Sequence, residues 1–580
     1  MFVILVLSLL VFTLEPNSAR AEIIDQNITL HPGWNAVFLE VEPENPDAAV
    51  VFAPDKFTPN LTASASIWKW NPRTSTVEFI QNPDVPVPEE SQWMVYYTGE
   101  TPEYQFISNL HAIHGDTPYL IYISGGAVEW TISGEPAIPH IDWKPNSFNF
   151  VGFHLMPGQG PNFDYFFSSS LAHAGQDIYI LNGGNWEQVT DPDTTSMVQG
   201  EGFWVYCNGS SEFTGPLSVR LEQGSGLLYG TTLQEQDLWV CNNSASNKDV
   251  HLTVNSTPPL YLYYWSFDPA NNVAEWVEFP TASDLDLTIP AGEMQKLRLG
   301  VRRTDLTAET PYEDNMFITD DDTRIRIPVS VTGINHNGLW VGDAVITKVS
   351  EPAETDNDDT PEDESLKPRK TGSEFSFRLI LHADDTGTVR LLSQVIQMWQ
   401  EGTWKPDPND LGKLIMDEPG YFVLFTDDGL LPNYTGAAMR DGQPVGRRIS
   451  APAFPSLNAA QGVMSGSAAP GSGFYPSEGN TLIKLITLAQ DNPVNPFRHM
   501  FHPDHKVPGQ SYQVFRLITL AFSDEDSDGR PITGIPSLNW GSSEIGGIYK
   551  ETLMGLHKQN INIEGTFVLR KVSSVGTLTQ

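Results

Sequence analysis

The sequence has little cysteine, little positive charge and no long hydrophobic segment, and each shortage excludes a class of protein. With two cysteines among 580 residues, the chain forms neither a disulfide framework nor a zinc site with four cysteine ligands. Only 33 lysines and arginines stand against 72 aspartates and glutamates, which gives a net charge of −39. A field of that sign repels phosphate backbones and anionic lipids, so we expect no nucleic acid and no membrane surface as partners.

An apolar run at the N-terminus predicts export. Residues 2–14 are almost entirely apolar, and Pro16 and the small-residue sequence Ala-Arg-Ala at 19–21 follow them. The run is shorter than the roughly 20 residues that span a bilayer, and this order of features is typical of a secretory signal peptide, although no basic residue precedes the run. We therefore expect a signal peptide at residues 1–21 and a mature chain that is secreted or periplasmic, with no transmembrane segment.

Catalytic signatures are also missing. The sequence contains no G-x-S-x-G elbow, no H-E-x-x-H, no phosphate-binding P-loop and no Rossmann fingerprint. Paired carboxylates leave no local signature, so a glycoside hydrolase or another secreted hydrolase stays open as an alternative. The pattern favours a protein that is not an enzyme.

Two stretches of the N-terminal part repeat each other. The matching segments, each an aromatic-rich run bounded by turn residues, are 31–39 with 145–153, 66–71 with 177–182, and 115–125 with 200–209. Such self-similarity is typical of a duplicated module, and the alternation within each run predicts β-strands. We expect two related β-modules, at residues 22–140 and 141–221.

The offsets between the copies predict where they differ. The offset falls from 114 to 111 to 84 at the pairs Trp34 and Phe148, Ile67 and Ile178, and Tyr119 and Phe203. The first copy thus has 27 extra residues between the last two pairs, which we place at 83–115, where residues 92–97 resemble an added hairpin strand. A rival alignment places 93–96 on 203–206 at an offset of 110. We prefer the first alignment because it matches glycine on both sides of the strand.

Residues 222–335 predict a third module. Six short alternating strands lie between turn signals, at residues 238–241, 251–254, 260–265, 285–289, 296–301 and 324–331. Six strands in about 110 residues suit an Ig-like β-sandwich. The three acidic residues at 320–322 are expected to form a polar hairpin tip.

Residues 336–580 predict a β-rich C-terminal domain. Its first strand is expected at 338–349, and the clearest hairpin in the sequence surrounds a turn at 384–387. The acidic segment at 351–374 is expected to be a mobile loop, because it cannot bury enough apolar surface to fold. The whole pattern predicts an all-β protein of several sandwich-like or barrel-like modules in tandem, including the duplicated module and the Ig-like sandwich.

The two cysteines, Cys207 and Cys241, end similar runs of sequence. In an oxidising compartment a disulfide between them would close a loop of roughly 35 residues and add on the order of 3–4 kcal/mol of stability. The alternative is two separate buried thiols, which is favoured by their position in adjacent predicted modules.

An acidic turn near the C-terminus has the start of a calcium loop. Asp524, Asp526 and Asp528 alternate and a glycine follows them, so their carboxylates are candidate calcium ligands. The twelfth position is Ile535 instead of glutamate, which excludes an EF-hand. The alternative is an acidic hairpin loop, and calcium is the one cofactor that the sequence suggests.

Three histidines lie within seven residues of one another. His499, His502 and His505 are candidate ligands for a transition metal. A proline between them prevents a helix that would align them, so ordinary loop or core histidines are the alternative. If the metal site exists, we expect Glu551 and His557 nearby.

The tryptophans of the repeats favour a binding function. Trp68, Trp70, Trp186 and Trp204 are candidates for a flat apolar surface that binds a glycan or another surface protein. The alternative is that they pack in the core. We therefore expect a secreted binding or adhesion protein of the cell surface or periplasm, with glycans or other surface proteins as partners. A structural component of the envelope or matrix is the second hypothesis.

Two parts of the chain resemble multi-domain secreted bacterial surface proteins. The resemblance rests on residues 289–299 in the middle module and on 377–384, 495–505 and 546–557 in the C-terminal block. It implies a location outside the cytoplasm and a β-rich fold. No activity is attached to that family, so the resemblance implies no mechanism.

Overall fold

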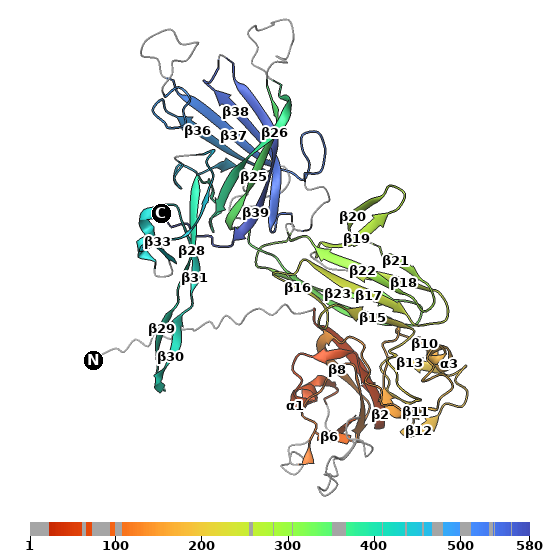
Figure 1. The fold of residues 1–580 in the computed structure, drawn as a ribbon. Helices are drawn as coiled ribbons and strands as arrows, with labels where there is room; N and C mark the ends of the chain where they lie inside the picture. The colour runs from red at the N-terminus through yellow and green to blue at the C-terminus, as the bar shows by residue number, and fades with distance from the viewer. Residues whose placement is uncertain are drawn as a thin grey trace. The chain divides into compact units, whose positions relative to one another are not determined.

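The computed structural model consists almost entirely of β-strands, most of them antiparallel (Figure 1). This confirms the all-β prediction of several modules in tandem. The chain divides into two compact units: unit 1 comprises Met1–Ser266, Val277–Val301 and Thr310–Thr332, and unit 2 comprises Phe267–Trp276, Arg302–Glu309 and Gly333–Gln580. The structure describes residues 22–60, 65–71, 93–98, 107–254, 259–281, 283–303, 306–350, 367–408, 410–434, 438–454, 457–466, 480–498, 512–532, 538, 540–557 and 559–579.

Unit 1 begins with two four-stranded sheets that share one strand order. In the first repeat the order is β2 (Gly33–Leu39), β7 (Thr117–Ile123), β5 (Ala65–Trp70) and β6 (Trp93–Tyr97). In the second repeat it is β9 (Ser147–Val151), β14 (Phe203–Cys207), β11 (Ile178–Asn182) and β12 (Asn185–Gln188). All neighbours in both sheets are antiparallel.

The pairing of residues across the strands is also the same in both sheets. Trp34 with Tyr122 and Ile67 with Ile121 in the first repeat correspond to Phe148 with Tyr206 and Ile178 with Val205 in the second. These pairs have the offsets of 114, 111 and 84 that the sequence gives. The alignment of Tyr119 with Phe203 is therefore confirmed, and the rival alignment at offset 110 is wrong.

Strand β6 corrects one prediction. Trp93 lies opposite Trp70, and Trp186 lies opposite Leu181, so the two tryptophans occupy equivalent positions at an offset of 93. Strand β6 is therefore the fourth strand of the shared sheet and not an added hairpin of the first repeat. The extra residues divide on either side of β6, because the offset falls from 111 before it to 84 after it.

Each repeat has a second layer over the buried face of its four-stranded sheet. In the first repeat this layer consists of β1 (Ile24–Leu30), β8 (Val128–Pro136), β3 (Val41–Pro43), β4 (Phe57–Thr58) and the short helix α1 (Ala48–Val51). In the second repeat it consists of β10 (Gln159–Asn162), β13 (Ser196–Val198) and α3 (Phe163–Phe167). Asp47 and Asn162 cap the two helices with their side chains, and each repeat encloses its own hydrophobic core.

The remainder of this part of the chain forms two five-stranded sheets. One sheet has the order β15 (Leu217–Leu221), β17 (Glu235–Asn242), β22 (Met294–Val301), β19 (Leu262–Asp268) and β20 (Val273–Glu278). The other has the order β16 (Leu227–Gly230), β24 (Arg324–Thr332), β23 (Pro311–Thr319), β18 (Lys248–Val254) and β21 (Leu285–Ile289).

All six strands predicted for this sandwich are present, at β17, β18, β19, β21, β22 and β24. Strand β15 pairs with β17, so its residues join the sandwich and not the second repeat, to which the predicted boundary assigned them. The relationship to Ig-like modules stays a prediction. The tip at residues 320–323 joins β23 to β24, which confirms the expected polar hairpin there.

Unit 2 is built on one sheet of eight strands. The order is β27 (Val389–Leu391), β26 (Arg369–Ala383), β25 (Gly338–Val349), β39 (Ile561–Ser573), β38 (Glu544–Met554), β37 (Val514–Phe522), β36 (Thr481–Leu488) and β35 (Ser465–Gly466). The sheet closes on itself, because the amide N of Leu391 donates to Gly462 O at 2.9 Å and the amide N of Met464 donates to Val389 O at 2.9 Å. A large hydrophobic cluster fills the closed sheet.

The predicted first strand at 338–349 and the hairpin between β26 and β27 are confirmed. Residues 369–374, expected in the mobile acidic loop, instead begin β26, because they pair with β25. Residues 351–366 lie outside the described residues, as do 1–21.

Three smaller sheets complete the described part of the unit. The first consists of β31 (Tyr421–Phe425), β28 (Gln394–Gln400) and β34 (Arg447–Ser450). The second pairs β29 (Thr403–Asp407) with β30 (Asp410–Glu418), and the third pairs β32 (Ala438–Arg440) with β33 (Gln443–Val445).

Candidate functional site

A cleft of about 760 Å³ lies in unit 1 where the two repeats meet strand β24 of the sandwich. We call it the repeat cleft. Its walls come from β1 and β2 of the first repeat, from the β11–β12 turn and residues 198–202 of the second, and from the start of β24. Because three separate parts of the chain build it, the cleft exists only in the folded unit.

Trp34 is the one tryptophan among the residues that line the repeat cleft. It is 39% exposed, and its ring packs edge-to-face on Tyr122 at 5.2 Å and on Trp68 at 6.3 Å between centroids. Side chains alternate between the faces of a strand, so these rings share the face of the sheet opposite the core. Trp68 in turn contacts Tyr97. We call Trp34, Tyr122, Trp68 and Tyr97 the outer aromatic row; it holds the Trp34 indole in a fixed orientation.

Two arginines of β24 also line the cleft. Arg324 and Arg326 alternate with Ile325 and Ile327, whose side chains are fully buried in the sandwich core. Both guanidinium groups therefore lie on the outer face of this sheet. The Arg326 guanidinium lies 3.7 Å from a carboxylate oxygen of Glu40, a distance that allows an ion pair but not a good hydrogen bond.

The positive charge of Arg324 and Arg326 is only partly neutralised. Glu40 is buried, and its two carboxylate oxygens accept hydrogen bonds from Gln199 Nε2 at 2.9 and 3.1 Å. Burial lowers the pKa of Arg324, and the positive charge of Arg326 lowers it further, but the group stays protonated. Arg324 Nε is buried and has no hydrogen-bond partner among the described residues. Two cations thus share one carboxylate.

Acidic groups also line the cleft, but at other places. Asp25 accepts a hydrogen bond from Ser133 Oγ at 2.5 Å, and burial raises the pKa of Glu201. The charged groups that act on Arg324 are Arg326 and Glu40. The arginine side of the cleft is therefore locally positive in a chain that is strongly negative overall.

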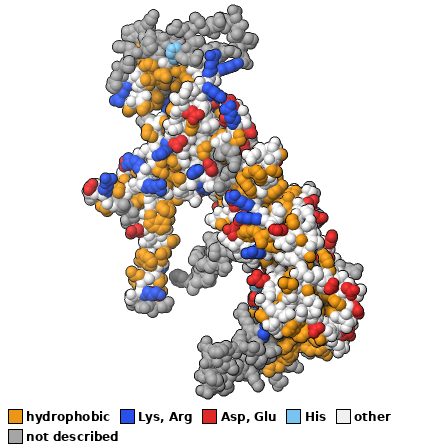
Figure 2. Space-filling model, turned by 45° about the vertical axis from the view of Figure 1, so that its right-hand side comes forward, with side chains coloured by type: hydrophobic (Ala, Val, Ile, Leu, Met, Phe, Trp, Pro, Cys, Tyr) orange, Lys and Arg blue, Asp and Glu red, His pale blue; other side chains and the backbone are white. Residues whose placement is uncertain are grey.

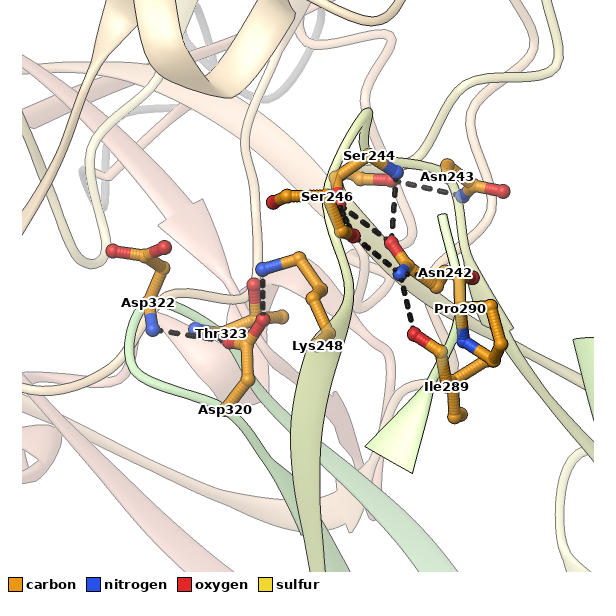
Figure 3. A network of polar contacts seen from close by, with 11 residues as sticks. Asn242, Asn243, Ser244, Ser246, Lys248, Ile289, Pro290, Asp320, Asp322 and Thr323 are labelled. Carbon is orange, nitrogen blue, oxygen red and sulfur yellow. Dashed lines mark hydrogen bonds and ion pairs between the residues drawn. The ribbon is translucent and has the colours of Figure 1, made fainter. Parts of the chain in front are cut away.

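A polar network next to the cleft fixes the start of β24 (Figure 3). Asp320 accepts hydrogen bonds from the backbone amides of Asp322 at 3.0 Å and Thr323 at 2.6 Å, and it pairs with the buried ammonium of Lys248. Burial alone would lower the pKa of Lys248, but the hydrogen bond and charge of Asp320 raise it above its usual range. This tip is thereby held directly before Arg324.

The same view shows a second set of contacts, centred on Asn242 (Figure 3). Its side-chain amide donates to Ser246 O at 2.8 Å and to Ile289 O at 2.9 Å, and its oxygen accepts from Ser244. All these bonds are internal, so Asn242 is a structural residue that ties the turn after β17 to the end of β21.

A smaller hollow of about 450 Å³ lies at the junction of the two repeats. It contains Asp116, whose pKa is raised by burial although the hydrogen bond from His154 at 3.1 Å opposes that shift. The other oxygen of Asp116 accepts from the amide of His140 at 2.6 Å. Burial also lowers the pKa of Lys69 in the same hollow. Because the Asp116 carboxylate is occupied by His140 and by His154 of the second repeat, its evident role is to join the repeats.

The four predicted surface tryptophans do not form one exposed row. All four are half-buried. The rings of Trp70 and Trp186 lie 5.4 and 6.2 Å from the ring of Trp204, between the two repeats. Trp93 and Phe150 complete this cluster. Of the predicted four, only Trp68 belongs to the outer aromatic row.

The structure places the two cysteines apart as free thiols. Cys207 faces the core of the second repeat, whereas Cys241 lies on β17 of the sandwich, opposite Ser218 of β15. Burial raises the pKa of both thiols. The disulfide hypothesis is wrong for this structure, because the two strands carry their thiols in separate modules.

Two of the three aspartates of the acidic turn, Asp526 and Asp528, are occupied by groups of the protein. Asp526 Oδ1 accepts from the amides of Asp528 at 2.8 Å and Arg530 at 2.9 Å, while Asp528 pairs with Lys348 at 2.6 Å. These contacts with Lys348 lower the pKa of Asp528. Calcium binding by Asp524, Asp526 and Asp528 stays a prediction. Lys348 already places a positive charge beside Asp528.

The predicted histidine cluster, His499, His502 and His505, lies outside the described residues. Of the residues expected beside it, Glu551 is buried in unit 2, where it pairs with Arg516 at 2.5 Å and accepts from Tyr549 Oη at 2.6 Å. His557 is half-buried. Glu551 is thus committed to an internal network, and the transition-metal hypothesis stays a prediction.

Among the described residues, one group of three could hold a metal ion. It consists of His251, Asp284 and Asp286 at the edge of the sandwich, with ligand atoms within 4.8 Å of one another. His251 Nδ1 lies 2.7 Å from Asp286, and Asp284 accepts from Thr253 Oγ1 at 2.8 Å. The hydrogen bond to Asp286 raises the pKa of His251. These internal contacts account for the group without an ion.

The residues that make the repeat cleft could not be recognised from the sequence alone. Trp34 was part of the first repeated segment, and period-two alternation would have placed it on one face with Trp68. Arg324 and Arg326 were recognised as strand residues, but nothing local distinguishes them from other exposed arginines. Their role depends on the contact with Glu40, almost 300 residues earlier in the chain.

No family model and no curated protein matches the sequence. A search of solved structures returns a chain of the CsuC–CsuE chaperone–tip adhesion subunit complex from the archaic Csu pili of Acinetobacter baumannii, with 11% identity over 30% of this chain and 97% of that one, at a TM-score of 0.13. It also returns Salmonella alpha-2-macroglobulin reacted with methylamine, with 9% identity over 96% of this chain and 45% of that one, at a TM-score of 0.13. These likenesses are too low to carry an argument. Across the described residues, no helix has the length and apolar character needed to cross a membrane.

Proposed function

We propose that this chain is a secreted, non-catalytic binding protein of the cell surface or periplasm that holds a glycan in the repeat cleft. The observation that carries the proposal is Trp34, an indole 39% exposed at the cleft and braced by two other aromatic rings. A rigid aromatic face is a surface on which a sugar ring can stack. The cleft is also in the size range of small-ligand sites.

The polar groups of the cleft suit the hydroxyl groups of a sugar. Asn27 and Gln199 line it with amide side chains, a type of group that both donates and accepts hydrogen bonds. The apolar run at residues 2–14, the net charge of −39 and the resemblance to secreted bacterial surface proteins support an exported location.

A glycan array probed with the mature chain, followed by calorimetry on the strongest ligand, tests the proposal. Trp34→Ala should weaken binding by about tenfold or more, because a central aromatic anchor is lost. Phe148→Ala is the matched control: Phe148 occupies the equivalent position of the second repeat but does not line the cleft. It should leave the affinity unchanged. Absence of binding to every glycan, or equal binding by Trp34→Ala, would refute the proposal.

A second candidate function, a structural component of an envelope or matrix, is favoured by one hairpin of unit 2. Trp404, Leu414 and Met416 on β29 and β30 are 59, 60 and 52% exposed, and hydrophobic side chains run along this projecting hairpin (Figure 2). Exposed apolar surface of this kind is typical of protein contacts. A concentration-dependent assembly that Trp404→Ser abolishes would support this function, whereas a chain that stays monomeric at every concentration would argue against it.

A further inference from the structure

The part of the repeat cleft that β24 lines carries positive charge, and this charge bears on the kind of glycan that the cleft binds. The inference rests on the proposed function and concerns the same site. Its basis is the pair Arg324 and Arg326, which both line the cleft.

The two guanidinium groups are placed by rigid structure. They lie two residues apart on β24, in register with Thr319 and Phe317 of β23. The Asp320–Lys248 pair secures the hairpin tip that precedes Arg324 (Figure 3). The ring of Phe317 supports Arg326, with the guanidinium carbon 5.9 Å from the ring centroid. Little ordering of these side chains would therefore be needed on binding.

Their hydrogen-bonding capacity is largely unused. Among the described residues, Arg324 Nε is buried without a hydrogen-bond partner, and the 3.7 Å contact of Arg326 with Glu40 is too long for a good hydrogen bond. A guanidinium group presents five N–H donors in a planar fork that matches the oxygens of a carboxylate or sulfate. A buried donor without a partner is costly, and a ligand that supplies an acceptor removes that cost.

The charge balance also favours an anion. Glu40 can neutralise one of the two cations, and Gln199 already engages both of its oxygens. The repulsion between the two arginines is reflected in the lowered pKa of Arg324, to which burial contributes most. An anionic group bound between them would relieve this repulsion.

We propose that Arg324 and Arg326 bind the carboxylate or sulfate group of an acidic glycan whose sugar ring stacks on Trp34. The ligand class is an oligosaccharide with at least one uronate, sialic acid or sulfate group. The arginine pair supplies the selectivity for acidic over neutral sugars, and Trp34 supplies binding that the two kinds of sugar share.

An array of uronate, sialylated and sulfated oligosaccharides beside neutral analogues of the same backbone tests this inference on the mature chain. Arg324→Gln and Arg326→Gln should each weaken binding of the acidic ligand at least about tenfold and leave the neutral analogue unaffected. Raising the salt concentration should weaken binding by the wild type more than by the variants. The array also separates carboxylate from sulfate as the recognised group.

Arg298→Gln is the matched control. Arg298 lies on β22 of the same sandwich, outside the cleft, and pairs with Glu235; its replacement removes one positive charge and should leave the affinity unchanged. Thermal denaturation of each variant checks that the fold is retained. If neutral and acidic sugars bind equally and the arginine variants behave as wild type, this inference is wrong while the proposed function stands. If no glycan binds, both fail.

Discussion

The two repeats of unit 1 share four strands in one register, but they differ in what covers the face opposite the core. In the second repeat, Phe150 and Trp204 fill the junction between the repeats. The equivalent positions of the first repeat hold Ala36 and Leu120, which are smaller. The duplicated scaffold is thus kept, while changes of side-chain size allow one copy to pack against the other.

The same face also carries a triplet that both copies retain. Trp34, Tyr122 and Trp68 of the first repeat correspond to Phe148, Tyr206 and Tyr179 of the second, and the rings of Trp34 with Tyr122 and of Phe148 with Tyr206 lie 5.2 Å apart in each case. Of these six residues, only Trp34 lines the repeat cleft. Position in the assembled unit, more than the module itself, therefore decides which triplet contributes a ring to the cleft.

A close contact between equivalent positions explains why the copies cannot be identical. Phe38 and Gly152 occupy the same place in their repeats, at an offset of 114, yet they face each other across the junction. A Cβ added to Gly152 would lie 2.2 Å from the ring of Phe38. Two large residues at this position would collide, so one copy must carry glycine.

The largest expected effect on stability comes from replacing the glycine at position 152 with a larger residue. Gly152→Val should destabilise unit 1 by about 3 kcal/mol, because the buried ring of Phe38 has no room to move. Urea denaturation followed by tryptophan fluorescence measures the change. Gly126→Val is the control, since a Cβ at Gly126 meets no atom within 4 Å, and it should cost only about 0.5 kcal/mol.

A second variant tests the cause. If the contact with Phe38 produces the loss, then Phe38→Ala combined with Gly152→Val should cost less than the sum of the two single changes. Equal costs for Gly152→Val and Gly126→Val would contradict the proposed packing of the junction.

The sequence predicted the shared strands of the two repeats only where a continuous run of residues in each copy carried the pattern. Three of the four shared strands were recognised, because each has an alternating aromatic run. Strands β6 and β12 share only Trp93 and Trp186, and the extra residues around β6 hid that single match. The sandwich strands, with their clear alternation, were found for the same reason as the first three.

The candidate site was the least predictable part. Trp34 and Arg324 approach one cleft only after two repeats and a sandwich have packed together, and no local pattern records that contact. The predicted tryptophans Trp70, Trp186 and Trp204 were assigned to a surface because a sequence shows that a strand face is aromatic but not what covers it.

A smaller effect is expected at a pair of asparagines that the repeats share. Asn35 and Asn149 each bond the backbone of the turn before their strand: Asn35 contacts His31 in both directions, and Asn149 contacts Lys144 in both directions. Asn149 is only 1% exposed, whereas Asn35 is half-buried. Loss of the buried amide leaves backbone groups without partners and without water.

Asn149→Ala should therefore cost about 2 kcal/mol and Asn35→Ala about 1 kcal/mol. Chemical denaturation of the two variants under the same conditions checks the order. Because the two positions are equivalent, each variant controls for the other. A larger loss at Asn35 than at Asn149 would show that burial does not determine the difference between these turns.

The smallest expected effect concerns pH and His173 of the second repeat. Its ring is fully buried against Trp143, with centroids 4.0 Å apart, and its Nε2 lies 2.9 Å from Ser211 Oγ. Burial lowers the pKa of His173, and the contact with the carbonyl of Tyr206 opposes the shift only in part.

The sign of the effect follows from that direction. The folded state favours the neutral ring, so the stabilisation is complete above the ordinary pKa of about 6.5 and is lost as the pH falls below it towards the lower pKa of the folded state. The four histidines of the first repeat, His31, His111, His114 and His140, are all exposed. Hydrogen exchange measured by mass spectrometry at pH 7.5 and pH 5 should therefore show a loss of protection in β11 and β14, with little change in β5 and β7. His173→Gln, which does not titrate, should remove that difference; if the variant lost protection as the wild type does, the acid sensitivity would arise from another group.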